Sequence, residues 1–265
     1  MRLSYNTSSV EDGQLLYSLD GTVPSLVYES ESPINISKNT ILRYAVAQNG
    51  TILDQGRKCF IKSNSEPVAI TFEGGKYLYK GDGGYGYYCF MTYVPTENLF
   101  ISDSDIEFCI IMDNKSEKPK DDDYEKFILK LAPVTYVPKD LPVLIRVHYK
   151  GDDFIDFDDY FNEITTDFSV TVYKDDSGIA SAEDGKYKLN DGNTFTNYLH
   201  YYENATPFPT QTTNNEYYYG LTYKSREKYD DLDIYVYDYS PYWKQITSGN
   251  FQARKAFLKT NAPLE

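Results

Sequence analysis

The alternation of apolar and polar residues near the start of the chain constrains its fold more strongly than any other feature. Apolar side chains occupy every second position within the run Thr40 to Ala47, at Leu42, Tyr44 and Val46. A β-strand places residues i and i+2 on one face, so this run predicts a strand with one buried face. Upstream, Asp20-Gly21 follows an apolar segment and predicts a turn. These residues predict a small β-sandwich at the beginning of the chain.

A family resemblance covers the same region, residues 1–63. It is carried by the stretch Tyr17-Ser-Leu-Asp-Gly-Thr-Val-Pro-Ser25, by Tyr28, by Pro33-Ile-Asn-Ile36 and by the run Thr40 to Ala47. These residues resemble the immunoglobulin-like C-terminal domain of chitobiases and β-hexosaminidases, a module that recurs in bacterial surface proteins and phage virion proteins. The resemblance implies an immunoglobulin-like sandwich appended to other domains, and it carries no catalytic residue. A domain this short buries little core alone, so we expect it to pack against its neighbours.

Composition indicates β structure for the rest of the chain as well. The 265 residues include 28 Tyr and 14 Phe, and aromatic residues make up 16% of the total. Aromatic side chains favour strands over helices. The length allows two or three domains. We therefore expect an all-β chain of tandem immunoglobulin-like β-sandwiches with a C-terminal β-rich region and little helix.

A second β-sandwich is predicted over residues 67–173. The polar segment from Lys62 to Pro67 separates it from the first. Strands are predicted at evenly spaced runs: Val68–Phe72, Tyr85–Val94, Asp105–Asp113, Phe127–Leu131, Val143–Tyr149 and Phe168–Tyr173. This order of strands, with the turn at Lys80-Gly-Asp-Gly83, resembles the N-terminal immunoglobulin-like domain of phage baseplate upper proteins.

Residues 174–265 are predicted to form a C-terminal β-rich assembly region, which begins with the polar segment from Lys174 to Gly185. Strands are expected at Phe195–Tyr202, Tyr217–Tyr223 and Leu232–Tyr239. Near the end, Ser248-Gly-Asn250 is a helix-capping sequence. We expect a short helix from there through Lys259, ending before Pro263.

The charge of the chain argues against two classes of partner. Its net charge is -14 and its isoelectric point is near 4.6. Proteins that bind nucleic acid concentrate Lys and Arg against the phosphates, so neither nucleic acid nor an anionic membrane is an expected partner. No stretch approaches the roughly 18 apolar residues of a membrane span, and the first residues lack the apolar segment of a signal peptide. We expect the chain to fold in a bacterial cytoplasm.

Signals for catalysis and cofactor binding are weak. Gly81-Asp-Gly-Gly-Tyr-Gly86 has the spacing of a dinucleotide-binding loop, but a β-rich run follows it, so we interpret it as a turn. His148 and His200 lie in different predicted domains, which disfavours zinc and serine-hydrolase chemistry. A pair of glycosidase carboxylates would meet only in the fold, so that alternative stays open. We predict no catalytic residue, no cofactor and no enzyme activity.

Cysteine and aspartate residues suggest structural roles. Cys59, Cys89 and Cys109 are odd in number and have apolar neighbours, which favours buried free thiols over a disulfide. The densest acidic stretch contains Asp152, Asp153, Asp156 and Asp158. Oxygen-rich loops bind calcium, but this stretch lacks the frame of an EF-hand. Both a solvated loop and a structural calcium site are open interpretations.

The most distinctive candidate site is a set of aromatic residues within residues 217–243. Tyr235, Tyr237 and Tyr239 alternate with other residues, so one face of a predicted strand carries three tyrosines. The other members are Tyr217, Tyr218, Tyr219, Tyr242 and Trp243. Tyrosine and tryptophan dominate protein interfaces, and aromatic rings also stack on sugars. The tyrosine face is therefore either a wall of the core or a contact surface for another chain.

These features together predict a non-enzymatic structural subunit of a bacteriophage virion: a collar, tail, baseplate, head-fibre or capsid-decoration protein. Such a subunit would assemble in the host cytoplasm. Its expected partners are other virion proteins and further copies of itself, in a homo-oligomer. The alternative is a carbohydrate-binding or adhesion module of a bacterial surface protein, with a glycan as its partner.

Overall fold

The computed structural model describes residues 3, 13–30, 32–75, 87–103, 106–117, 126–149, 166–209, 216–229 and 235–261. These residues form antiparallel β-sheets and contain no helix, which confirms the all-β class. In this part of the chain, no helix is long and apolar enough to cross a membrane.

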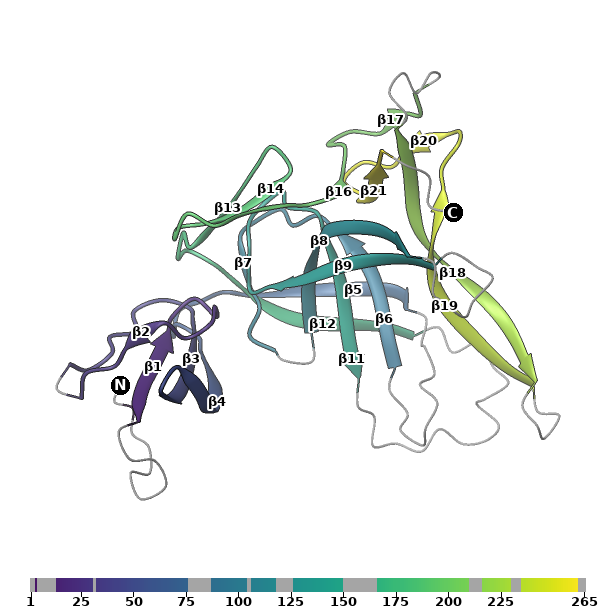
Figure 1. The fold of residues 1–265 in the computed structure, drawn as a ribbon. Helices are drawn as coiled ribbons and strands as arrows, with labels where there is room; N and C mark the ends of the chain where they lie inside the picture. The colour runs from purple at the N-terminus through teal and green to yellow at the C-terminus, as the bar shows by residue number, and fades with distance from the viewer. Residues whose placement is uncertain are drawn as a thin grey trace.

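The first module is a four-stranded antiparallel sheet in the order β2-β1-β3-β4 (Figure 1). Its strands are β1 (Gln14–Ser18), β2 (Leu26–Val27), β3 (Thr40–Gln48) and β4 (Thr51–Phe60). The strand predicted from Thr40 to Ala47 is confirmed as β3, but Tyr44 and Val46 of the predicted apolar face are half-buried, whereas Ile41, Ala45 and Ala47 of the opposite face are buried. Asn49 and Gly50, with φ of 51° and 79°, form the tight turn between β3 and β4, as Asn-Gly does in two-residue hairpins. The apolar pair Ile34 and Ile36 lies in a loop, where Ile34 is buried.

The central module is a sandwich of two four-stranded antiparallel sheets, in the orders β10-β7-β12-β5 and β6-β11-β8-β9. The strands of the first sheet are β5 (Pro67–Gly75), β7 (Leu99–Phe100), β10 (Tyr136–Val137) and β12 (Thr166–Lys174). Those of the second are β6 (Tyr87–Tyr93), β8 (Ile106–Glu117), β9 (Lys126–Val134) and β11 (Val143–Tyr149). Apolar residues of both sheets form one core, which includes Ile70, Phe108, Ile145 and Val172. Each strand predicted for this module is present.

The sheet that contains β8 and β11 is buried on both faces. Phe108 and Ile110 belong to the sandwich core, whereas Ile111 packs in a separate cluster with residues of the C-terminal third. Leu144 of β11 belongs to that separate cluster as well. These strands are continuous apolar runs because each face has a packing partner.

The described strands of the C-terminal third form three small sheets, β13-β14-β15, β16-β21-β18-β19 and β17-β20. They are β13 (Ala180–Glu183), β14 (Lys186–Leu189), β15 (Thr194–Thr196), β16 (Leu199–His200), β17 (Thr206–Pro207), β18 (Tyr217–Tyr229), β19 (Tyr235–Gln245), β20 (Asn250–Phe251) and β21 (Phe257–Thr260). Tyr187 of β14 is buried in the sandwich core, and Leu199 and Leu258 pack with Leu144. This third of the chain therefore shares its cores with the sandwich.

The helix predicted after Ser248-Gly-Asn250 is wrong, because β20 and β21 occupy that segment. Phe251 and Phe257 contact each other in a buried aromatic cluster, with ring centroids 4.5 Å apart. β21 pairs with both β16 and β18, which are distant in the sequence. Pairing and burial with these partners outweigh the local capping signal.

Buried residues fix the first module to the sandwich. The Tyr136 hydroxyl donates a hydrogen bond to the backbone carbonyl of Asn39 (3.2 Å), and the Asn39 side-chain amide donates one to the carbonyl of Lys174 (2.9 Å). Tyr136 and Asn39 are almost completely buried. Ile41 and Phe100 pack in the same cluster as Tyr136. The first module thus packs against its neighbour, as its short length predicts.

Candidate functional site

The predicted aromatic site falls on a long two-stranded ribbon made by β18 and β19. The strands pair from Tyr219 and Gln245 to Tyr229 and Tyr235. Among the described strands, β21 pairs with β18 at its first residues, Tyr217 to Tyr219, and β19 has no partner besides β18. Beyond Tyr219 the ribbon continues for about 30 Å at the rise of a β-strand. Its far end runs away from every other described strand (Figure 1).

The register of the ribbon assigns its residues to two faces, because directly opposite residues of an antiparallel pair share a face. The positions of the aromatic face are Tyr219, Leu221, Tyr223, Ser225, Glu227 and Tyr229 on β18, and Tyr235, Tyr237, Tyr239, Pro241, Trp243 and Gln245 on β19. The polar face carries Thr222, Lys224, Arg226 and Lys228 on β18, and Val236, Asp238, Ser240, Tyr242 and Lys244 on β19. The first face is thus richer in aromatic residues and the second in basic residues.

The base of the aromatic face is part of the protein core. Tyr219 is 2% exposed, and Leu221 and Trp243 pack on the cluster that includes Ile111 and Leu144 of the sandwich. The face that packs on the sandwich at Tyr219 and Trp243 therefore continues along β19 toward the far end of the ribbon, through the positions of Tyr239, Tyr237 and Tyr235.

The predicted interface residues fall into three groups. The chain buries the first group, wholly or in part, in its own core: Tyr217, Tyr218 and Tyr219. The register assigns the second group to the aromatic face: Tyr235, Tyr237, Tyr239 and Trp243. The third, Tyr242, falls on the polar face. The first group supplies core packing and has little surface to offer a partner. The side chains of Tyr235, Tyr237, Tyr239 and Tyr242 lie outside the described residues, so the backbone register alone makes the second group the candidate contact face.

The histidine and the two cysteines whose side chains the structure describes, His200, Cys59 and Cys109, are half-buried or buried. The His200 ring stacks on Phe257 with centroids 6.2 Å apart, and burial, reinforced by nearby Lys259, lowers its pKa. Cys59 and Cys109 are free thiols, and burial raises the pKa of Cys109 to about 12. The prediction of free thiols is confirmed for these two. The side chain of Cys89 lies outside the described residues.

The remaining sequence candidates lie outside the described residues. These are the glycine-rich motif Gly81 to Gly86 and the acidic residues Asp152, Asp153, Asp156 and Asp158. The residues that directly follow the glycine-rich motif form strand β6, as the turn interpretation requires. Within the described part of the chain, no group of three or more His, Cys, Asp and Glu side chains is arranged to hold a metal ion.

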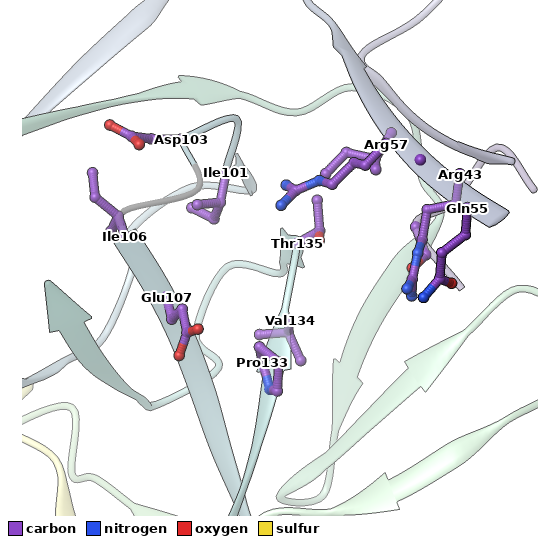
Figure 2. A pocket seen from close by; sticks show the side chains of 13 residues that line it. Arg43, Gln55, Arg57, Ile101, Asp103, Ile106, Glu107, Pro133, Val134 and Thr135 are labelled. Carbon is purple, nitrogen blue, oxygen red and sulfur yellow. The ribbon is translucent and has the colours of Figure 1, made fainter. Parts of the chain in front are cut away.

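A cleft of about 570 Å³ lies between the first module and the sandwich. Figure 2 shows its two walls. The first module contributes Gly21, Ile41, Arg43, Gln55, Gly56 and Arg57, and the sandwich contributes Ile101, Asp103, Ile106, Glu107, Pro133, Val134 and Thr135. One wall is therefore basic and the other acidic, with apolar side chains on both.

Hydrogen bonds within the cleft differ between the two walls. The Arg43 guanidinium donates to the Gly21 carbonyl (3.3 Å). Arg57 has no hydrogen-bond or ion-pair partner among the described residues. On the opposite wall, Arg146 donates through Nε to the Glu107 carboxylate (2.8 Å) and forms a second contact to the same oxygen through its Nη2. Glu107 is thus neutralised by Arg146 from its own sheet.

No protein family, curated protein or solved structure matches this chain. The ribbon, the cleft and the chemistry of their residues therefore carry the functional conclusions.

The sequence indicated strands at Tyr217–Tyr223 and Leu232–Tyr239, which fall in the region of β18 and β19, but it indicated neither their pairing into a ribbon nor the cleft. Alternating tyrosines identify a strand face without its partner strand, so the strand had a local signal. The cleft requires Arg43 and Arg57 of the first module to meet Asp103 and Glu107 of the sandwich. These residues are scattered over the sequence and match no motif, so only the fold unites them.

Proposed function

We propose that this chain is a structural subunit of a bacteriophage virion, without enzyme activity, and that it assembles through the β18–β19 ribbon. The aromatic face carries this proposal. It begins inside the chain's own core at Tyr219 and Trp243 and continues beyond it at Tyr237 and Tyr239. Tyrosine and tryptophan are frequent anchors of protein interfaces, because they bury a large area at a low cost in side-chain entropy.

The backbone of the ribbon supports the same conclusion. An isolated two-stranded hairpin is at best marginally stable in water. An edge strand also offers unpaired N–H and C=O groups to another chain. Among the described strands β19 is such an edge. A second chain that packs on the aromatic face, or that extends the sheet at β19, would stabilise the ribbon.

Charge favours another copy of this chain as the partner. The polar face carries Lys224, Arg226 and Lys228 at alternate positions, whereas the whole chain has a net charge of -14. With Lys244 and Asp238 counted, the described positions of this face remain net basic, and a basic face is attracted to the acidic surface of a second copy. Such a contact joins two different surfaces, and contacts of that kind close into rings or extend into filaments. Rings and filaments are the assemblies that a collar, tail or baseplate subunit has to form.

The resemblance of residues 1–63 to a module found in phage virion proteins supports the virion context. In that context the subunit would assemble in the host cytoplasm, with other virion proteins as further neighbours. The copy number in the assembly distinguishes the components, since a ring indicates a collar, tail or baseplate and a lattice indicates a capsid-decoration protein.

The first test is the mass of the full-length chain by light scattering after size exclusion, over a range of concentrations, with negative-stain images of each peak. We expect a discrete oligomer or a polymer. A variant with Tyr235→Ser, Tyr237→Ser and Tyr239→Ser removes three anchors of the aromatic face, and we expect it to be monomeric.

The matched control changes the polar face of the same strand with Val236→Ser and Tyr242→Ser. This variant should assemble as the wild type does. A wild-type monomer at every concentration would contradict assembly as the function, and an equal loss in both variants would contradict the role of the aromatic face.

A further inference from the structure

Two arginines of the basic wall come from opposite positions on neighbouring strands, and Figure 2 shows Arg43 beside Gln55 and the Arg57 guanidinium pointing away from them into the cleft. Arg43 and Arg57 are directly opposite each other in the β3–β4 pair, so they share a face of the sheet. Like charges at such positions are destabilising. Arg43 has the Gly21 carbonyl as its partner, and Arg57 has no partner among the described residues. An anion bound in the cleft would relieve the repulsion and accept hydrogen bonds from the Arg57 guanidinium.

The balance of charge selects an anion over a zwitterion. The opposite wall carries Asp103 and Glu107, but Arg146 already neutralises Glu107. Arg43, Arg57 and Arg146 thus supply three positive charges in or next to the cleft, and Asp103 and Glu107 supply two negative ones. The cleft is locally positive although the whole chain has a net charge of -14. This locally positive cleft favours a ligand with one negative charge.

The cleft is formed before any ligand arrives. The Tyr136 hydroxyl and the Asn39 side chain lock the first module to the sandwich next to it. Gly21, with φ of 80°, lies against Ile41 and Thr135, where a β-carbon would stand 3.6 Å from both side chains. Because the walls are already ordered, binding of a ligand loses little conformational entropy of the protein. The volume of about 570 Å³ lies within the range of small-molecule sites.

We propose that this cleft binds an acidic sugar, a hydroxylated ligand with a single carboxylate. The carboxylate would pair with Arg57, since a guanidinium group matches carboxylate geometry, and Arg43 would add positive charge to the same wall. The Gln55 amide and the carboxylates of the acidic wall suit ring hydroxyls, which donate and accept hydrogen bonds. Ile101, Pro133 and Val134 offer apolar surface to the C–H groups of a sugar ring. The site is independent of assembly through the ribbon.

The test is calorimetric titration of the full-length protein with glucuronate and with N-acetylneuraminate, alongside glucose and inorganic phosphate. We expect one or both sugar acids to bind, and glucose to bind at least about tenfold more weakly. Arg57→Gln should weaken the binding of the sugar acid by at least about tenfold. Affinity should also fall from low to high salt, because salt screens the ion pair between the carboxylate and Arg57.

Lys58→Gln is the matched control. Lys58 follows Arg57 on β4 and is opposite Leu42, so it belongs to the other face of the strand, and its Nζ lies 5.6 Å from the centroid of the Phe60 ring. The Lys58→Gln substitution therefore removes the same charge as Arg57→Gln, but from the face that does not line the cleft. Its affinity should equal that of the wild type. No binding of either sugar acid, or equal losses in both variants, would overturn the proposal. Phosphate binding as tightly as the sugar acids would reduce the site to an unspecific anion pocket and would overturn the sugar assignment.

Discussion

Cys109 is a buried thiol on β8, 1% exposed, and burial raises its pKa from 9.0 to about 12, with a further contribution from Glu107. In the unfolded chain the same thiol ionises near its ordinary value. Folding therefore favours the protonated thiol. Its contribution is fully present below pH 9 and is lost as the pH rises toward 12.

This shift predicts how stability depends on pH. Between pH 9 and 10 the wild type should lose unfolding free energy more steeply than Cys109→Ala, by up to about 1.4 kcal/mol per pH unit. Urea unfolding at several pH values measures both slopes. Cys59→Ala should change the slope less, because Cys59 is only partly buried. Identical slopes in Cys109→Ala and the wild type would contradict the raised pKa.

Two buried asparagines join the modules, and the sequence could not have identified them. The Asn197 side chain accepts hydrogen bonds from the backbone N–H groups of Ile111 (3.1 Å) and Leu199 (3.2 Å), and it donates one to the Pro142 carbonyl (2.7 Å). Asn39 has the same role at the other junction. Asparagine is usually exposed, and its burial depends on backbone groups from distant segments. Nothing local distinguishes these two from the other asparagines.

At the scale of strands, period-2 patterns predicted most of the central sandwich and failed near the end of the chain. Strands such as β3 and β11 alternate or run apolar over their whole length, so their own residues reveal them. β20 and β21 are short, and a capping sequence precedes them. Whether these residues form strands depends on their pairing with β17, β16 and β18, and neighbouring residues in the sequence do not reveal that pairing.

The connection between β20 and β21 holds the C-terminal third against the sandwich through Arg254. Its guanidinium donates hydrogen bonds to the Asp140 carboxylate (2.9 Å), the Pro95 carbonyl (3.0 Å) and the Glu203 carboxylate (2.5 Å). The Arg254 backbone has a φ of 52°, a conformation that costs about 1 kcal/mol for residues other than glycine.

Two substitutions of Arg254 can therefore distinguish the contribution of its side-chain hydrogen bonds to stability from the cost of its backbone conformation. Arg254→Ala should lower the unfolding free energy by about 1–3 kcal/mol, because it leaves the partners without their donor. Arg254→Gly loses the same hydrogen bonds but relieves the backbone, so it should be the more stable of the two variants by about 1 kcal/mol. Urea unfolding compares them, with exposed Lys255→Ala as the neutral control. If the alanine variant were as stable as the glycine variant, the backbone argument would fail.

At the scale of the whole molecule, the three modules are packed into one body through shared cores. Ile41 of the first module packs with Phe100 of the sandwich and Ile179 of the C-terminal third. Tyr187 enters the sandwich core, and Leu258 covers its outer face. Removing residues 174–265 would therefore expose apolar surface of the sandwich. A change in the oligomeric state of such a truncated chain could then come from misfolding and not from the loss of an assembly contact. A test of assembly has to spare these cores.

Shortening the ribbon meets that condition. Lys224 and Ser240 are opposite each other in the register, so replacing residues 225–239 by Asn-Gly closes the ribbon with a two-residue hairpin turn. The described pairing of β18 with β21, at Tyr217 to Tyr219, lies in the retained part of the ribbon, so the unfolding free energy should change by less than about 1 kcal/mol while the oligomer is lost. Tyr219→Ala is the opposite control, because it should destabilise the fold by about 2–5 kcal/mol through a cavity in the core. Light scattering and thermal unfolding on the same samples decide the outcome. A folded, shortened chain that assembles like the wild type would show that the contact lies elsewhere, and an unfolded one would show that the far end of the ribbon serves folding instead.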